Sequence, residues 1–335
     1  MAEDAALVRG LGERLTAEAG LPPPRAVIRL SGGKNNRVYR LDDASVLKLY
    51  HWDPSDPRDR LRAEWGFLSY AQARGVADVP RPLARDDTAH AGLYSLLPGR
   101  KPVAGDVTPA YVDSALAFLL AVNAAPRDPM VLDPGSEACF SLNEHITTIE
   151  RRVARLGEID PALPGQAAAL IRDRLRSAWD RVRAVLLGSA ERLGIAADRL
   201  LDETELCVSP SDFGFHNALA DDGRIGFIDF EYAGRDDPAK LACDFFCQPE
   251  VPVPVRYVGD FVGRLTDGLG LTEVHAARCH LLLDAYRVKW ACIILNDFLP
   301  GGAARRAYAD LAGTPERYDR QLARAVAKLN EIGLR

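Results

Sequence analysis

Short alternating stretches of apolar and polar residues fill the first third of the chain, and apolar residues recur at helical spacing over most of the rest. Strands are predicted at residues 26–30, 37–41, 45–50, 81–84 and 92–97. Helices are predicted at residues 3–19, 58–74, 111–123, 142–156, 170–187 and from 238 to the end. This order predicts an α+β fold, in which a small antiparallel sheet with one main helix precedes a larger, mostly helical part.

Pro98-Gly99 marks the division between the two parts, because this pair continues neither a strand nor a helix. We therefore expect an N-terminal lobe at residues 1–97 and a C-terminal lobe at residues 98–335. Within the second lobe, residues 205–229 interrupt the helices with short β-like pieces and with loops rich in Ser, Pro, Gly and Asp. Loops on a rigid scaffold often carry function, so this stretch is the first candidate for a site.

The amino-acid composition narrows the classes of function that this chain could have. Lys and Arg number 42 against 47 Asp and Glu, a net charge of −5, and no long basic run provides a surface for nucleic acid. The acidic N-terminus lacks the pattern of an export signal. Residues 281–299 are apolar but interrupted by charges, which indicates a buried helix and no membrane span. We expect neither nucleic acid nor a membrane as a partner; no pattern speaks to oligomeric state.

The six cysteines are scattered along the chain, at positions 139, 207, 243, 247, 279 and 292. Scattered cysteines in a chain of this size are typical of reduced, buried thiols, and we expect a cytoplasmic protein. Their spacing, including the pair Cys243 and Cys247, matches no standard zinc-ligand pattern.

Lys48 stands alone as a charge inside an apolar strand. A buried ammonium group needs a counter-charge, and Glu64 lies on the inward face of the following predicted helix. The alternative is an edge-strand lysine whose head group reaches water, with Glu64 at the surface. Gly32 and Gly33, between the first two strands, would let the backbone approach phosphates closely, although such turns are also common in ordinary hairpins.

Residues 212–217, Asp-Phe-Gly-Phe-His-Asn, fit the spacing D-x-x-x-x-N of a kinase catalytic loop, in which the aspartate is the base and the asparagine binds Mg²⁺. Asp229 follows the β-like residues 225–228, where a second metal ligand is expected. The two motifs in this order predict phosphoryl transfer better than either does alone. The chain has no Walker A pattern, which excludes P-loop kinases.

Taken together, these residues and the sequence Asp-Phe-Glu-Tyr at 229–232 resemble the aminoglycoside phosphotransferase and choline kinase superfamily, from about residue 25 to about residue 300. Glu231 stands where protein kinases have Gly, and no long activation segment follows. The resemblance implies a protein-kinase-like bilobal fold and an enzyme that moves the γ-phosphoryl group of ATP to a hydroxyl of a small molecule, such as an aminoglycoside, a choline-like amino alcohol or a sugar.

The resemblance also assigns roles to single residues. Asp212 would be the catalytic base, and Asn217 and Asp229 would hold Mg²⁺. Lys48, braced by Glu64, would grip the phosphates beneath the Gly32-Gly33 turn. Adenine would hydrogen-bond to the backbone of the connector between the lobes, at Ser95 and Leu97.

Departures from the family pattern at three positions leave a second interpretation open. Pro210 stands where the family usually has His, and Ser211 where it usually has Gly. The family's bracing Asp on the helix after Pro238 is replaced by Leu241, and we expect Asp244, one turn later, to serve instead. The alternative function is a nucleotide-binding, pseudokinase-like module without efficient transfer.

The acceptor site is the least defined part of the prediction. Polar residues interrupt the apolar helix near the C-terminus: Asp284, Arg287, Asn296 and Asp297. They either pair internally, as Asp284 and Arg287 could at i, i+3, or face a ligand. The aromatic rings of Tyr232 and Trp290 could favour a quaternary ammonium group. For His216 we expect a packing or loop hydrogen-bonding role and no catalytic one.

Overall fold

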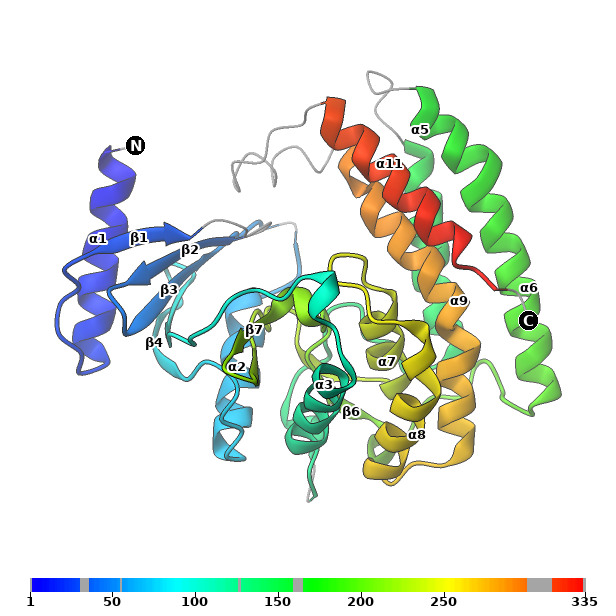
Figure 1. The fold of residues 1–335 in the computed structure, drawn as a ribbon, viewed down its shortest axis with the longest axis horizontal. Helices are drawn as coiled ribbons and strands as arrows, with labels where there is room; N and C mark the ends of the chain where they lie inside the picture. The colour runs from blue at the N-terminus through cyan, green and yellow to red at the C-terminus, as the bar shows by residue number, and fades with distance from the viewer. Residues whose placement is uncertain are drawn as a thin grey trace.

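The computed structural model describes residues 2–30, 36–54, 56–125, 128–158, 165–299 and 315–333. A strand-rich lobe comes first, and a helical lobe follows (Figure 1). The strand-rich lobe contains α1 (Ala2–Glu18), β1 (Val27–Leu30), β2 (Asn36–Leu41), β3 (Ser45–Tyr50), α2 (Arg60–Ala73), β4 (Pro82–Asp86) and β5 (Ala91–Ser95).

The helical lobe begins with α3 and contains two two-stranded antiparallel sheets, the hairpin β7-β8 and the pair β6-β9. Its helices are α3 (Pro109–Val122), α4 (Leu142–Arg155), α5 (Gly165–Leu170), α6 (Arg176–Arg192), α7 (Pro238–Cys247), α8 (Val258–Gly268), α9 (Glu273–Leu295) and α11 (Pro315–Asn330). Its strands are β6 (Cys207–Ser209), β7 (Ala218–Asp221), β8 (Arg224–Phe227) and β9 (Gly234–Asp236). The predicted α+β class and bilobal architecture are confirmed; the exact division at residues 97 and 98 remains a prediction.

The first lobe is built on one antiparallel sheet with the strand order β1-β2-β3-β5-β4. Successive side chains of a strand point to opposite faces, so Leu47 and Lys48 lie on different sides of β3. The face that carries Leu47 and Leu93 packs against Leu15 and its apolar neighbours on α1. The face that carries Lys48 looks toward Glu64 of α2. The alternation along one strand thus separates a dry face from the face on which the chemistry lies.

Glycine residues shape the end of α2, as the sequence predicts, and the segment that leads into the helical lobe. Helix α2 ends before Gly75, which adopts a left-handed φ of 72° and donates its N–H to the carbonyl of Gln72. The Pro98-Gly99 break leads directly into the helical lobe, where Arg100 pairs with Ala220 of β7. Gly99 has a φ of 118°, and a Cβ there would lie 2.7 Å from the Ala220 carbonyl oxygen, so glycine is required at this crossing.

A large apolar core fills the helical lobe and reaches the inner side of α2. Helix α9 lies at its centre, packed against α7 and α11 and also touching α4 and α6 (Figure 1). All six cysteines are buried and free. None of the helices in the described ranges combines the length and the apolar character that a membrane crossing requires.

Candidate active site

Lys48 has the counter-charge that its buried position requires. Its Nζ lies 2.6 Å from Oε2 of Glu64, and both side chains are almost completely buried. The same carboxylate oxygen accepts a hydrogen bond of 2.8 Å from the Tyr50 hydroxyl, which fixes its direction. Burial alone would lower the pKa of Lys48, but the charges of Asp229 and Glu64 prevail and raise it well above its ordinary value. The ammonium group is therefore held charged where β3 faces α2.

Asp229 reaches Lys48 from the other lobe. Its Oδ1 contacts the Lys48 Nζ, although 181 residues separate the two in sequence. Asp229 follows β8 directly and has a φ of 70°, in the left-handed region that only glycine adopts freely. Such a conformation costs about 1 to 3 kcal/mol and is concentrated at functional sites. Because its side chain stays 38% exposed, Asp229 also faces the solvent between the lobes.

The catalytic-loop motif is a single compact turn. Asp212 follows Ser211, which has a φ of 63° and donates its N–H to the Ser209 hydroxyl at 3.1 Å. The amide Nδ2 of Asn217 donates to the Asp212 carbonyl at 3.0 Å, so this hydrogen bond uses the amide nitrogen and not Oδ1. The Asn217 carbonyl accepts a bond from the Ile228 N–H at 2.9 Å, immediately before Asp229. The two predicted motifs are thus held side by side by the backbone.

His216 lies close to the predicted base. Its Nε2 is 3.3 Å from Oδ1 of Asp212, and the Asp212 side chain is 35% exposed. Gly214 leaves room for the imidazole ring, since a Cβ there would lie 2.9 Å from the His216 Nδ1. The contact agrees with a role for His216 in supporting the loop.

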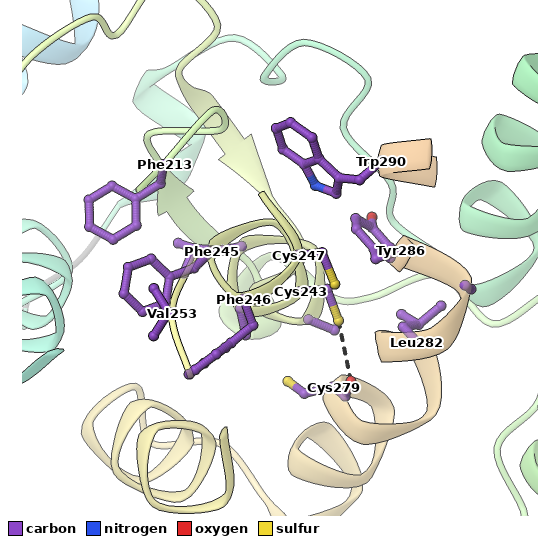
Figure 2. Close-up of a cluster of buried hydrophobic side chains, with 14 of the residues drawn as sticks. Phe213, Cys243, Phe245, Phe246, Cys247, Val253, Cys279, Leu282, Tyr286 and Trp290 are labelled. Carbon is purple, nitrogen blue, oxygen red and sulfur yellow. Dashed lines mark hydrogen bonds between the residues drawn. The ribbon is translucent and has the colours of Figure 1, made fainter. Parts of the chain in front are cut away.

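Aromatic rings from α3, β8 and α7 pack against the catalytic loop. Phe213 packs against Phe118, Phe227 and Phe245 at centroid distances of 5.7, 4.9 and 5.3 Å, and Phe215 meets the ring of Phe245 at 5.5 Å. Figure 2 shows Phe245 of α7 turned toward Phe213, while Cys243 and Cys247 occupy the opposite side of the helix. The loop therefore rests on apolar packing against α3, β8 and α7.

The expectation that Asp244 braces the catalytic loop is wrong. Its carboxylate accepts hydrogen bonds from Nζ of Lys289 at 3.0 Å and from Nε1 of Trp290 at 2.9 Å, both on α9. Asp244 lies one residue from Phe245, on a different side of α7, because successive helical residues are rotated by about 100°. Leu241 is buried in the core. Asp244 therefore ties α7 to α9.

A buried network of charges lies behind the catalytic loop. Asp236, the last residue of β9, pairs with Lys240 at 2.8 Å, and Asp237, the next residue, caps α7 by accepting the Ala239 N–H at 2.7 Å. Asp237 also pairs with Arg278 of α9 at 2.5 Å. Removing one partner from such a network would leave an uncompensated buried charge, which costs free energy. The paired charges therefore hold the segment before α7 in one conformation.

His145 of α4 belongs to this network and gives it a pH dependence. Its ring nitrogens contact the Tyr286 hydroxyl at 2.8 Å and Asp237 at 3.0 Å. Burial alone lowers the pKa of His145, but neighbouring Cys139 and the hydrogen bond with Asp237 oppose this and raise it to about 9. The pKa of His145 is near 6.5 in the unfolded chain and about 9 in the folded chain. Between these pH values the folded chain keeps a proton that the unfolded chain has lost. The free energy of unfolding therefore decreases as pH rises through this window.

We expect the melting temperature of the wild type to exceed that of His145→Gln most at pH 6. Glutamine can still form hydrogen bonds at this buried position, but it cannot carry a positive charge. The difference should shrink as pH rises from 7 to 10, measured by differential scanning calorimetry in matched buffers. A difference that stays constant over this range would show that His145 does not gain a proton on folding.

The connector and the glycine turn were both predicted to contact the nucleotide. Strand β5 ends at Ser95, whose N–H donates to the Arg81 carbonyl at 2.9 Å and whose hydroxyl accepts from the Arg81 N–H at 2.9 Å. Leu97 is half-buried and packs close to Gly226 of β8. Within the described ranges no hydrogen bond engages the Leu97 backbone N–H. Gly32 and Gly33 lie outside the described residues.

The polar residues of the C-terminal helices are paired internally. Arg287 contacts Asp284 at 2.5 Å, which confirms the predicted i, i+3 pair. Asn296 accepts a bond from Arg155 at 2.8 Å, and Asp297 accepts one from Arg317 at 2.9 Å. These contacts favour the internal interpretation over the alternative in which the side chains face a ligand.

The two aromatic rings considered for a quaternary ammonium group are also engaged by the protein. The guanidinium groups of Arg58 and Arg60 lie 5.7 and 5.9 Å from the Tyr232 ring centroid. Trp290 is buried, and its indole N–H is bonded to Asp244. The described side chains thus offer no support for that recognition mode.

Sequence reasoning did not predict one set of contacts near the site, those of Glu231 with Asn36 and Arg60. The Asn36 amide donates to Oε2 of Glu231 across the lobes, and Arg60 of α2 lies 3.9 Å from the same oxygen. No periodic pattern connects polar residues 195 positions apart. The available signal was Glu231 itself, an acidic residue between the aromatic residues Phe230 and Tyr232.

The geometry described above agrees with comparisons to known proteins. A sequence model described as the phosphotransferase enzyme family matches residues 26–261. The chain belongs to this family. The predicted family resemblance and the prediction of a small-molecule kinase are confirmed. No curated protein matches the chain in sequence.

Solved structures of this family share the fold over nearly the whole chain. A choline/ethanolamine kinase family protein from Mesorhizobium loti has a TM-score of 0.59 at 19% identity, and the match covers 98% of this chain and 99% of that one. The aminoglycoside phosphotransferase APH(2'')-Ib, bound to ADP, has a TM-score of 0.58 at 11% identity, with the same coverage. Spectinomycin phosphotransferase APH(9)-Ia, in complex with ADP and spectinomycin, has a TM-score of 0.58 at 13% identity, covering 96% of this chain and 98% of that one.

Proposed function

We propose that this phosphotransferase moves the γ-phosphoryl group of ATP, in the presence of Mg²⁺, to a hydroxyl group of a small molecule. The observation that carries the proposal is the convergence of Lys48, Asp229 and the Asp212 loop, which come from three separated parts of the chain. Two of the structural relatives were solved with ADP and one with AMP-PNP, which supports a nucleotide at this position.

The donor atoms near Asp229 suit Mg²⁺. Oδ1 of Asn217 and the carboxylate of Asp229 are hard oxygen donors, and Mg²⁺ is commonly bound by one or two such groups together with substrate phosphates. Bound there, the ion would neutralise charge on the phosphates. Lys48 would hold the phosphates from the sheet side, since its Nζ already faces Asp229. The connector, at the Leu97 N–H and the Ser95 carbonyl, would orient the adenine.

Asp212 is the base in this proposal. Its partly exposed carboxylate would orient the acceptor hydroxyl and take its proton as the hydroxyl oxygen bonds to the γ-phosphorus. The bond from that phosphorus to the β–γ bridging oxygen breaks, and ADP leaves. Positioning and electrostatic stabilisation supply most of the rate enhancement in phosphoryl transfer, so a rigid loop is an advantage. The aromatic support beneath Phe213 provides that rigidity.

The acceptor class is proposed from the family and tested directly. Structural relatives carry names of aminoglycoside, spectinomycin and choline kinases, so we propose an aminoglycoside, an amino alcohol or a sugar. The six buried free cysteines support a cytoplasmic setting for such an enzyme.

We expect at least one acceptor to stimulate ADP release well above the acceptor-free rate. The measurement is a coupled ADP-release screen with ATP and Mg²⁺ across aminoglycosides, choline, ethanolamine, homoserine and free sugars. Stimulation that requires Asp212 would support transfer. Mg²⁺-dependent ATP binding with no stimulated release by any acceptor would favour the nucleotide-binding module instead, and absence of ATP binding would refute both.

A further inference from the structure

The chain segment shortly before α4 lies along β9, on the side of that strand opposite β6. Pro134 forms a parallel bridge with Arg235 of β9. The Gly135 N–H donates to the Arg235 carbonyl at 3.0 Å, and the Arg235 N–H donates to the Asp133 carbonyl at 3.0 Å. We call residues 133–136 the β9 edge segment. Since β6 also pairs with β9, the strand is held between two neighbours.

Main-chain contacts fix the β9 edge segment closely against its neighbour. A Cβ on Gly234 of β9 would collide with the Asp133 carbonyl oxygen and with the Gly135 backbone nitrogen. The two backbones therefore meet with no side chain between them. The Ser136 N–H adds a hydrogen bond of 2.9 Å to the Tyr232 carbonyl. The position of the segment is thus set by the backbone of residues 232–235.

Gly135, at the centre of this segment, is buried against Ser211, the residue before the proposed base. A Cβ on Gly135 would lie 2.8 Å from the Ser211 Oγ, which is too close for two atoms that are not bonded. Ser211 is only 4% exposed, and its hydroxyl has no hydrogen-bond partner among the described residues. The Ser211 side chain therefore occupies the space that a side chain at position 135 would need.

The conformation of Ser211 is unfavourable by itself, so its surroundings have to maintain it. Its φ of 63° lies in the left-handed region, which a residue with a Cβ adopts at a cost. A hydroxyl that is buried without a partner costs further free energy. If the β9 edge segment moved away, the hydroxyl could reach water and the backbone could relax. Packing against Gly135 keeps Ser211 in place, and Asp212 is the next residue.

We propose that Gly135 is a positioning residue for the catalytic base: because it has no side chain, the β9 edge segment can pack against Ser211 and hold the backbone before Asp212 in its left-handed conformation. In this role Gly135 contacts neither the nucleotide nor the acceptor. The inference rests on the proposed function, because it takes Asp212 as the base.

The first test places a methyl group at position 135. In Gly135→Ala the new Cβ meets the Ser211 hydroxyl, so either Ser211 or the β9 edge segment has to shift. We expect kcat with the best acceptor from the screen to fall about tenfold, since small displacements of a reacting group reduce the rate strongly. The affinity for ATP with Mg²⁺, measured by calorimetry, should stay within about twofold, because we expect Lys48 and Asp229 to keep their contact.

The second test moves the side chain from one partner to the other. When Ser211→Gly is combined with Gly135→Ala, the new methyl group takes the space that the hydroxyl has left, and glycine adopts the left-handed φ freely. We expect the double variant to turn over at least about fivefold faster than Gly135→Ala alone. Ser211→Gly by itself completes the cycle and should lose less kcat than Gly135→Ala.

Gly188→Ala is the matched control, because it makes the same change on α6. There the nearest heavy atom to the new Cβ would be Nη1 of Arg192, at an ordinary contact distance of 3.6 Å. Both kcat and the ATP affinity should stay within about twofold of the wild type.

Each outcome decides a separate question. Equal losses of kcat and ATP affinity in Gly135→Ala would overturn the inference, since they would show a general distortion. An unchanged kcat, or a double variant no faster than Gly135→Ala, would also overturn it, and the proposed function would still stand. A wild type without acceptor-stimulated ADP release would refute the proposed transfer, and the inference with it.

The melting temperatures show which comparison to use. If Gly135→Ala melts more than about 5 °C below Gly188→Ala, the double variant is compared with Ser211→Gly alone. A kcat equal within about twofold would support the inference, because alanine at position 135 is then tolerated once the Ser211 side chain is gone. A tenfold lower kcat in the double variant would overturn it.

Discussion

Asp212→Asn is expected to lower kcat by roughly 10²- to 10⁴-fold while the affinity for ATP stays nearly unchanged. The amide has the shape of the carboxylate but cannot accept the acceptor's proton. Its backbone contacts are retained, because Asn217 donates to the main-chain carbonyl of residue 212 and not to the side chain. Steady-state kinetics with the best acceptor from the screen gives kcat, and calorimetry gives the ATP affinity.

Asp221→Asn is the matched control for this experiment. Asp221 ends β7 and is exposed, so the same change of charge there should leave kcat within about twofold. Turnover in Asp212→Asn equal to that of the control would remove Asp212 from its role as base. A large loss of ATP affinity in the same variant would instead indicate that the loop had been distorted.

Asp229→Ala is expected to reduce Mg²⁺-dependent ATP affinity by at least about 100-fold. The change removes a hard oxygen donor for the ion and also one of the two carboxylate partners of Lys48, so two contacts to the phosphates are weakened together. ATP titrations with Mg²⁺ and with EDTA separate the two effects, because only the first requires the metal. The advantage conferred by Mg²⁺ should disappear in the variant.

Asp222→Ala provides a control with similar backbone geometry. Asp222 has a φ of 41° and lies exposed in the turn between β7 and β8, so it tests alanine in the left-handed region without touching the site. Both variants should melt at similar temperatures. A normal Mg²⁺-dependent titration of Asp229→Ala would contradict the assignment of Asp229 as a ligand.

The sequence predicts those parts of the structure that follow local rules. Alternation within β2, β3 and β5 and the helical repeat of α2 reveal the sheet and its helix, because burial of one face imposes a period on the chain. Lys48 and Glu64 could be paired in advance for a related reason. A charge in an apolar strand must find an opposite charge, and the next helix offers Glu64 on its inward face.

Other features depend on contacts without a local signal. Asp244 was expected at the catalytic loop, but the orientation of α7 turns it toward Lys289, and only the packed structure fixes that rotation. Strand β9 has three residues, too few to show a period. Asn36 and Glu231 meet only because the lobes dock. The tertiary packing of the chain, and not the local propensity of these residues, determines where they lie.

Helix α1 bears on how far the two halves of this molecule are modular. Its residues Val8, Leu11 and Leu15 provide one wall of the small core beneath Leu47 and Leu93. A nucleotide lobe transplanted to another catalytic half would have to bring this helix along. Without α1, the face of the sheet opposite Lys48 would expose its apolar side chains to solvent. A chimera designed from the strands alone would therefore be expected to aggregate.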